Sequence, residues 1–175
     1  KEAHKSHNRL FHNNRDGTFT DVTEKAGVAG DGYDMGIDAG DYDNDGWADI
    51  FVASVTDNHL YHNNHDGTFS DVSARMGIAR SPGHGLGVLA TDVNEDGWPD
   101  IYVANDGDPN QLWINNRGTS FTNDALLAGV AVSRAGAPQG SMGIDAGDID
   151  GDGDEDLFVT NLDNESNTMY LNVGK

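Results

Sequence analysis

The sequence predicts an all-β fold, a β-propeller segment of about three four-stranded blades, because two independent markers repeat along it with one period. The first marker combines Asn, Leu or Met, an aromatic residue and a further Asn, and successive copies are 50, 52 and 57 residues apart. Its copies begin at Asn8, Asn58, Asn110 and Asn167. The second marker is an acidic loop that begins at Asp41, Asp92 and Asp148, at intervals of 51 and 56 residues. A shared period of about fifty residues is typical of propeller blades.

Each repeat is expected to contain four strands. A run of small residues such as 35–40 suits a strand that packs closely against others, and the apolar run 50–52 after the acidic loop suits a buried strand. The Asn-x-Leu-aromatic segment and the Gly-Thr-Phe segment form the outer hairpin, with turns at Asp16-Gly17 and Asp66-Gly67. A short helical turn that glycine ends follows in three copies, at Gly27, Gly77 and Gly129. The copies then supply two, four, four and three strands, thirteen in all.

The repeats divide the chain without a break in composition. We expect a polar leader at 1–7, part of a blade at 8–30, blades at 31–80 and 81–132, and an incomplete blade at 133–175. Closed propellers typically have about four to eight blades, so these repeats cannot close a ring alone. Both ends supply a third strand and do not complement each other. A fragment of a longer propeller, whose remaining blades are its partners, is therefore predicted, and self-assembly into a ring is the alternative.

The acidic loop at 41–49 places four carboxylates at positions 1, 3, 5 and 9 and glycine at position 6. Carboxylates this close repel one another, and each raises the pKa of its neighbours. A hard cation removes the repulsion, and alternating Asp residues on a tight turn supply the oxygens that calcium needs. Three copies in register make the prediction of calcium specific, with about three ions, one for each loop.

An EF-hand is the alternative that this loop excludes. An EF-hand needs an acidic residue at position 12 and a helix on each side. Position 12 is valine in every copy, at Val52, Val103 and Val159. Each valine lies in an apolar run that is typical of a buried strand. The loop is therefore expected to join two strands and to close its ligand set at position 9.

The charge of the chain limits its partners. Thirty acidic residues against ten basic residues give a formal net charge of −20. Such a charge disfavours nucleic acid and anionic membrane surfaces as partners. No apolar run is long enough for membrane insertion. Eleven of the acids occupy the proposed ligand positions, which favours cation binding over solubility as their role.

Polar residues outside the acidic loops are further candidate sites. His12 and His62 occupy equivalent positions, but the third copy has Ile114 there, so packing is the predicted role. Asp38 and Asp145 precede the loops and are expected either to support the calcium ligands from behind or to face a central channel. The Asn-Asn pairs are expected to hydrogen-bond within their own turns. No catalytic constellation stands out from the repeat, so the chain is predicted not to be an enzyme.

The Asp-x-Asp/Asn-x-Asp-Gly-x-x-Asp loop, together with the apolar strand after it, resembles the FG-GAP or VCBS repeat of integrin α-chain propellers. The Asn-x-Leu-aromatic-x-Asn-Asn and Gly-Thr-Phe segments resemble the cartilage acidic protein group, and the likeness covers about residues 8–172. It implies a secreted or surface propeller, of seven blades by this likeness, with calcium between strands 1 and 2. The implied side-chain ligands are Asp41, Asp43, Asp45, Asp49, Asp92, Asn94, Asp96, Asp100, Asp148, Asp150, Asp152 and Asp156. The implied carbonyl ligands are Trp47, Trp98 and Asp154.

The expected function follows from this likeness. The chain would be an extracellular or periplasmic scaffold for adhesion, or for binding a protein or carbohydrate, with structural calcium. Asn94 removes one charge, so the middle site is expected to be the weakest. The alternative is a calcium-dependent enzyme, a lyase or hydrolase of polysaccharide. That enzyme would need a base such as His, Lys or Tyr near the propeller axis, and an activity screen on acidic polysaccharides separates the two.

Overall fold

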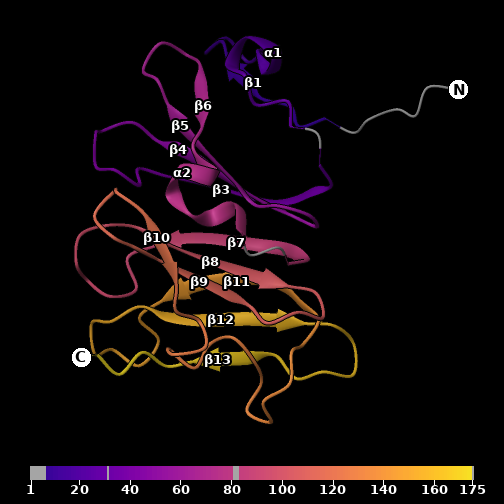
Figure 1. Cartoon of the computed structure of the whole chain (residues 1–175), viewed down its shortest axis with the longest axis vertical. Helices are drawn as coiled ribbons and strands as arrows, with labels where there is room; N and C mark the ends of the chain where they lie inside the picture. Colours follow the sequence, from indigo (N-terminus) through magenta and orange to yellow (C-terminus); the bar gives the residue numbers. More distant parts are fainter. Residues whose placement is uncertain (1–6, 31, 81–82, 175) are drawn as a thin grey trace, which may run out of the picture.

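The structure, a computed structural model, describes residues 7–30, 32–80 and 83–174. Within these ranges, thirteen strands form antiparallel sheets of two, four, four and three strands. The sheets follow one another in chain order along the longest axis of the molecule (Figure 1). The all-β propeller-segment prediction is therefore confirmed. The predicted polar leader lies outside the described residues except for His7.

In every sheet, neighbouring strands are also neighbours in sequence, which is the topology of a propeller blade. The two-stranded sheet contains β1 (Phe11–Asn13) and β2 (Phe19–Asp21). The next sheet contains β3 (Asp34–Gly40), β4 (Asp49–Ser54), β5 (His59–Asn63) and β6 (Phe69–Asp71). The third contains β7 (Gly85–Thr91), β8 (Asp100–Asn105), β9 (Gln111–Asn115) and β10 (Phe121–Asn123). The last contains β11 (Ser141–Gly147), β12 (Asp156–Asn161) and β13 (Thr168–Tyr170).

The short helical turns follow the fourth strand of a blade. The helices are α1 (Thr23–Ala26) and α2 (Ser73–Met76), with a 3₁₀ turn, η1 (Ile78–Arg80), after α2. Gly27 and Gly77 end the helices in the left-handed conformation, with φ of 78° and 86°. The third expected helical turn, before Gly129, forms as a single turn without a regular helix. The Ala128 N–H donates to the Asp124 carbonyl, the next bonds span three and five residues (Leu126 to Gly129, Ala125 to Val130), and Gly129 is left-handed with φ of 75°. None of the described helices is long and apolar enough to cross a membrane.

The hydrophobic core lies between the sheets. The largest cluster joins the second sheet to the third through Phe51, Leu60, Ile101 and Trp113. Met76 from the turn after β6 is fully buried in the same cluster. A second cluster joins the third sheet to the fourth, and a third joins the α1 segment to β4 and β5. Each helical turn therefore covers the interface with the following sheet, and burial of apolar area holds consecutive blades together.

The first strands of the three larger sheets, β3, β7 and β11, approach one another closely because they carry glycine. A Cβ atom on Gly36 would lie 2.8 Å from the Leu86 carbonyl oxygen, and one on Gly87 would lie 2.6 Å from the Met142 carbonyl oxygen. Asp38 adds a bond across the same interface, since its Oδ2 accepts the Ala90 N–H at 2.7 Å. Neither role expected for Asp38 describes this contact, which links two blades.

We predict that Gly87→Ala destabilises the protein through this close approach. The added methyl group would press on a carbonyl of the next strand, which cannot move without shifting β11. Overpacking of this kind typically costs about 1–3 kcal/mol. Urea unfolding should therefore show a lower midpoint.

Gly147→Ala is the matched control, because no heavy atom lies within 4 Å of its Cβ position. The equivalent position of β7 is Thr91, which already carries a side chain. This variant should stay within about 0.5 kcal/mol of the parent. Equal midpoints for both variants would contradict the close approach.

Candidate metal centres

The three acidic loops share one backbone conformation. They join β3 to β4, β7 to β8 and β11 to β12. Position 4 has positive φ in each copy, at Asn44 (56°), Glu95 (55°) and Gly151 (83°). Position 6 is also left-handed, at Gly46, Gly97 and Gly153. A left-handed backbone favours glycine and tolerates asparagine. This preference explains why glycine recurs at position 6 of every loop.

The aspartate at position 1 organises each turn. Its two oxygens accept the backbone N–H groups of later positions in the same loop. Asp41 accepts from Asp45 at 3.0 Å and from Gly46 at 2.8 Å. Asp92 accepts from the matching residues Asp96 and Gly97. In the third loop, Gly151 and Gly153 donate to Asp148 at 2.7 and 3.1 Å. These bonds direct the side chains of positions 1, 3 and 5 toward one another.

The carboxylates of positions 1, 3 and 5 converge in the first and third loops. In each set, one oxygen of every member lies within 4.8 Å of the others, and the sets are Asp41, Asp43 and Asp45, and Asp148, Asp150 and Asp152. Asp43 Oδ1 is buried, and no hydrogen bond of the described residues reaches it. Desolvation and the Asp152 charge raise the pKa of Asp150. A buried oxygen without a donor, among like charges, fits a divalent cation with oxygen ligands.

The middle loop carries one carboxylate less at its ligand positions. Asn94 occupies position 3, and its Oδ1 accepts the Asp96 N–H at 3.0 Å. The amide oxygen remains a cation ligand in kind, but it brings no negative charge. Asn94 thus occupies the loop position that Asp43 and Asp150 occupy in the other two loops.

The aspartates of position 9 lie at the bottom of each loop and are fully buried: Asp49, Asp100 and Asp156. Each accepts the backbone N–H of an asparagine at the end of the third strand of its sheet or, for Asn172, two residues beyond that strand. The pairs are Asp49 with Asn63 at 2.8 Å, Asp100 with Asn115 at 2.7 Å, and Asp156 with Asn172 at 2.8 Å. Burial raises the pKa of Asp49 and raises that of Asp100 to about 7. Position 9 thus joins the loop to the third strand, a role that the sequence analysis did not identify.

Position 7 lies beside position 5 in every loop. The backbone N–H groups of Trp47, Trp98 and Asp154 donate to the position 5 carboxylates at 2.8, 3.1 and 3.0 Å. Their role as carbonyl ligands stays a prediction.

The asparagines at the ends of the third strands connect successive loops. The Asn115 amide donates to the carbonyl of Tyr42 in the preceding loop at 2.8 Å, and the Asn172 amide donates to that of Val93 at 2.9 Å. The prediction that the Asn-Asn pairs bond within their own turns holds for the second member, since Asn64 Nδ2 donates to Thr68 Oγ1. For the first member of a pair, such as Asn115, the prediction is incomplete. Its amide also bonds to another blade, and that contact depends on three-dimensional packing.

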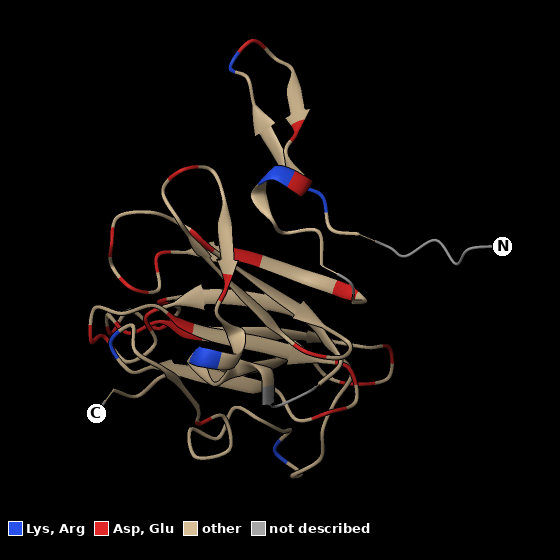
Figure 2. Cartoon of the chain, turned by 45° about the horizontal axis from the view of Figure 1, so that its top comes forward, with Lys and Arg blue, Asp and Glu red and all other residues tan. Residues whose placement is uncertain are grey.

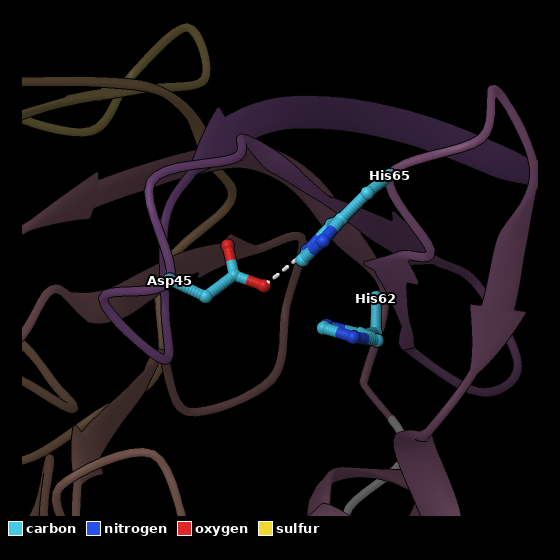
Figure 3. Close-up of side chains that lie close together, drawn as sticks. All are labelled: Asp45, His62 and His65. Carbon is cyan, nitrogen blue, oxygen red and sulfur yellow. Dashed lines mark hydrogen bonds and ion pairs between the residues drawn. The ribbon is translucent and has the colours of Figure 1, made fainter.

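Two histidines from the β5–β6 hairpin reach the first loop (Figure 3). His65 Nε2 lies 2.5 Å from Asp45 Oδ2, and His62 Nδ1 lies 3.3 Å from both Asp43 Oδ2 and Asp49 Oδ1. Desolvation acts to raise the pKa of Asp45, but the His65 bond and the Trp47 N–H outweigh it and lower that pKa. Packing is an incomplete description of His62, because its ring meets the Tyr42 ring edge-on and its Nδ1 also lies near these two carboxylates. The equivalent residue of the β9–β10 hairpin is Ile114, so the repeat pattern alone gives no sign of this contact.

Acidic residues outnumber basic residues, and many of them lie on the loops between strands (Figure 2). Repeated four-stranded antiparallel sheets, each with an acidic loop between its first two strands, define a β-propeller type of repeat protein. The FG-GAP-like repeat model matches the chain three times, over residues 3–52, 41–103 and 92–159. The chain therefore belongs to the FG-GAP-like repeat family, as the sequence resemblance implied.

A solved structure with a similar fold is a lectin from Agrocybe aegerita, whose title describes recognition of non-reducing terminal N-acetylglucosamine. The two chains are 21% identical with a TM-score of 0.51, and the match covers 89% of this chain. This chain spans 41% of the length of the lectin chain. At this identity the likeness shows the fold alone. No curated protein matches the sequence.

We predict a pH dependence of the metal-free protein that arises from buried Asp100. Its folded pKa of about 7 lies above the usual value of 3.8, so its contribution to stability is full below about pH 4. That contribution is lost as the pH rises to about 7. The melting temperature in chelator should therefore fall between pH 4.5 and pH 7.5, and Asp100→Asn should reduce the slope.

Asp66→Asn is the control for this experiment. A hydrogen bond from the Thr68 hydroxyl lowers the pKa of Asp66 below its usual value of 3.8. The contribution of Asp66 to stability is therefore lost only as the pH falls below that value. Its slope above pH 4.5 should match that of the parent. Equal slopes for the parent and Asp100→Asn would contradict the raised pKa.

Proposed function

We propose that the chain is a calcium-binding module of an extracytoplasmic β-propeller, which serves as a scaffold for adhesion or for binding a protein or carbohydrate. One observation carries the calcium proposal: acidic side chains converge in the first and third loops. In the first loop, the buried Asp43 Oδ1 lies in this cluster and has no hydrogen-bond donor among the described residues. The side chains of positions 1, 3, 5 and 9 and the carbonyl of position 7 would hold the ion. When bound, calcium supplies the positive charge that these carboxylates lack.

The proposed role of the ion is structural. Position 1 already shapes the turn, and position 9 bonds the loop to the third strand of the same sheet. The asparagine at that strand end bonds to the preceding loop, as Asn115 does with the Tyr42 carbonyl. An ion that neutralises one loop therefore stabilises a blade and its contact with the next. Because the unfolded chain has no such site, the binding free energy adds to the folding free energy.

The proposed location follows from the openness of the sites. The position 5 residues, Asp45, Asp96 and Asp152, are exposed, so water competes for the ion. Sites of this kind are useful where calcium is about millimolar, as it is outside cells. We infer an extracellular or periplasmic setting, with the Asn94 loop as the weakest of the three sites.

We expect excess calcium to raise the melting temperature and a chelator to lower it. An ion at about 100 times its dissociation constant stabilises the folded state by about 2.7 kcal/mol for each site. Asp152→Ala should remove one bound ion from the stoichiometry measured by calorimetry. Asp163→Ala is the control, because Asp163 lies in an exposed turn outside the three acidic loops. A melting temperature that does not respond to chelator would refute structural calcium.

A further blade is the partner that the exposed apolar face of β3 requires. Val88 of β7 and Ile144 of β11 pack against the core clusters of the described sheets. Ile37 occupies the same register on β3, opposite Val52, and 68% of its surface is exposed. Met35 and Tyr33 are exposed beside it. The exposed face is therefore the place where the first two strands of a preceding blade would pack.

We predict that the purified chain self-associates in a concentration-dependent manner through this face. Ile37→Lys should weaken the association in sedimentation velocity, because a charge would be buried at the contact. Leu126→Lys is the matched control, since Leu126 is exposed on the turn after β10 and away from β3. Equal weakening by both substitutions, or association by neither the parent nor the variants, would contradict the proposal.

Binding is the proposed role rather than catalysis. The first strands β3, β7 and β11, which lie side by side, contain no His, Lys or Tyr. A polysaccharide lyase would need such a base near the axis. A hydrolase would need a pair of carboxylates, and the carboxylates of Asp38 and Asp145 on these strands accept the backbone N–H groups of Ala90 and Ala146. The loops between strands are left as the surfaces that would recognise a partner.

A further inference from the structure

The first acidic loop differs from the others because imidazoles approach its carboxylates. We propose that Asp45, His62 and His65, here called the histidine corner, bind a divalent metal of the zinc type. One ligand atom from each of the three residues lies within 4.8 Å of the others. The site shares Asp45 with the calcium site proposed above, and a carboxylate can offer one oxygen to each ion. Calcium selects oxygen ligands and leaves the imidazole nitrogens unused, so those nitrogens distinguish the two sites.

The chemistry of the three side chains favours zinc. Two imidazole nitrogens with one carboxylate oxygen form a ligand set that zinc, copper and nickel prefer over calcium and magnesium. Three protein ligands also leave a fourth position open for water or for a group of a partner. Asp43 places a further carboxylate beside the histidines, since its Oδ2 lies 3.3 Å from His62 Nδ1.

The rings are held in place before any metal arrives. The His65 ring stacks on Trp47, with centroids 5.2 Å apart and planes inclined by 15°. The His62 ring meets the Tyr42 ring edge-on at 6.1 Å. The backbone of His65 is left-handed, with φ of 66°, and its N–H donates to Asn63 Oδ1 at 3.0 Å. A site whose ligands are already oriented loses less conformational entropy on binding.

Access and burial also suit a metal site. The His65 side chain is 43% exposed, so an ion can reach the corner from solvent. His62 Nδ1 is buried and makes no hydrogen bond of good geometry. The contacts of this nitrogen with Asp43 Oδ2 and Asp49 Oδ1, at 3.3 Å, do not replace a well-formed hydrogen bond, and its absence costs free energy. A metal at this corner would fix the orientation and tautomer of that ring.

The other hairpins provide natural controls. The residue that corresponds to His62 is Ile114 in the hairpin of β9 and β10, and the residue that corresponds to His65 is Arg117. Arg117 has φ of 55°, so the turn keeps its left-handed backbone with arginine. His62→Ile and His65→Arg therefore convert the corner into an arrangement that this fold already contains.

The test is a zinc titration by calorimetry in the presence of excess calcium. The parent should bind one zinc equivalent that calcium does not displace. Loss of residues that merely support a metal ligand weakens binding roughly 10- to 100-fold, so loss of a direct ligand should do at least as much. We therefore expect His65→Arg and His62→Ile each to raise the zinc dissociation constant at least about tenfold, and the double variant to lose this equivalent.

Cobalt provides a second measurement on the parent alone. Bound at the histidine corner, Co²⁺ should give a visible absorption band that zinc removes. Absence of that band, or identical zinc binding by the parent and the double variant, would overturn the proposal. Displacement of the zinc equivalent by calcium would do the same, since it would assign the ion to carboxylates.

Calcium stoichiometry of the same variants separates this proposal from the function proposed above. Histidine variants that lose zinc and keep their calcium support the histidine corner. A parent that binds zinc at this corner but binds no calcium would contradict the calcium proposal alone.

Discussion

The fold depends on a carboxylate that is buried in each of the three larger sheets. Asp49, Asp100 and Asp156 have no exposed surface, yet an isolated buried carboxylate is costly. Each obtains a backbone N–H from the third strand of its own sheet. In the first and third loops the other oxygen accepts the N–H of position 2, from Tyr42 and Ile149. One side chain therefore fixes where the loop begins, where it ends and which strand lies beside it.

This constraint extends from one blade to the next. The strand end that donates to the buried aspartate also carries the asparagine whose amide bonds to the preceding loop, as Asn115 and Asn172 do. Glycines on the inner strands allow β3, β7 and β11 to approach closely, and Asp38 adds a bond between β3 and β7. The loop, the blade and the interface are consequently one cooperative unit, as expected of stacked repeats. A cation that lowers repulsion in one loop would act on that whole unit.

Much of this arrangement is predictable from the sequence, because the repeat encodes it locally. The period, the four strands and the acidic loop each leave a contiguous pattern, such as the Asp-Gly pairs or the apolar run before Ser54. The contacts of Asn115 with Tyr42 and of Asp38 with Ala90 leave no such pattern, since they join residues 73 and 52 positions apart. The contact of His62 with the acidic loop leaves no such pattern either, because the equivalent residue of another blade is Ile114.

The contrast between the loops has a physical explanation in the way a blade is built. The hairpin turn that holds His65 has the same left-handed backbone in Arg15 and Arg117, so this position does not determine the fold. Its side chain nevertheless reaches the acidic loop of its own blade, where Asp45 lies 2.5 Å away. The fold does not require one particular residue at this position, although its side chain faces a carboxylate cluster. A histidine there can therefore change the ligand set from oxygen alone to oxygen and nitrogen. Metal preference can therefore differ between blades while the strands, the buried aspartate and the loop backbone stay the same.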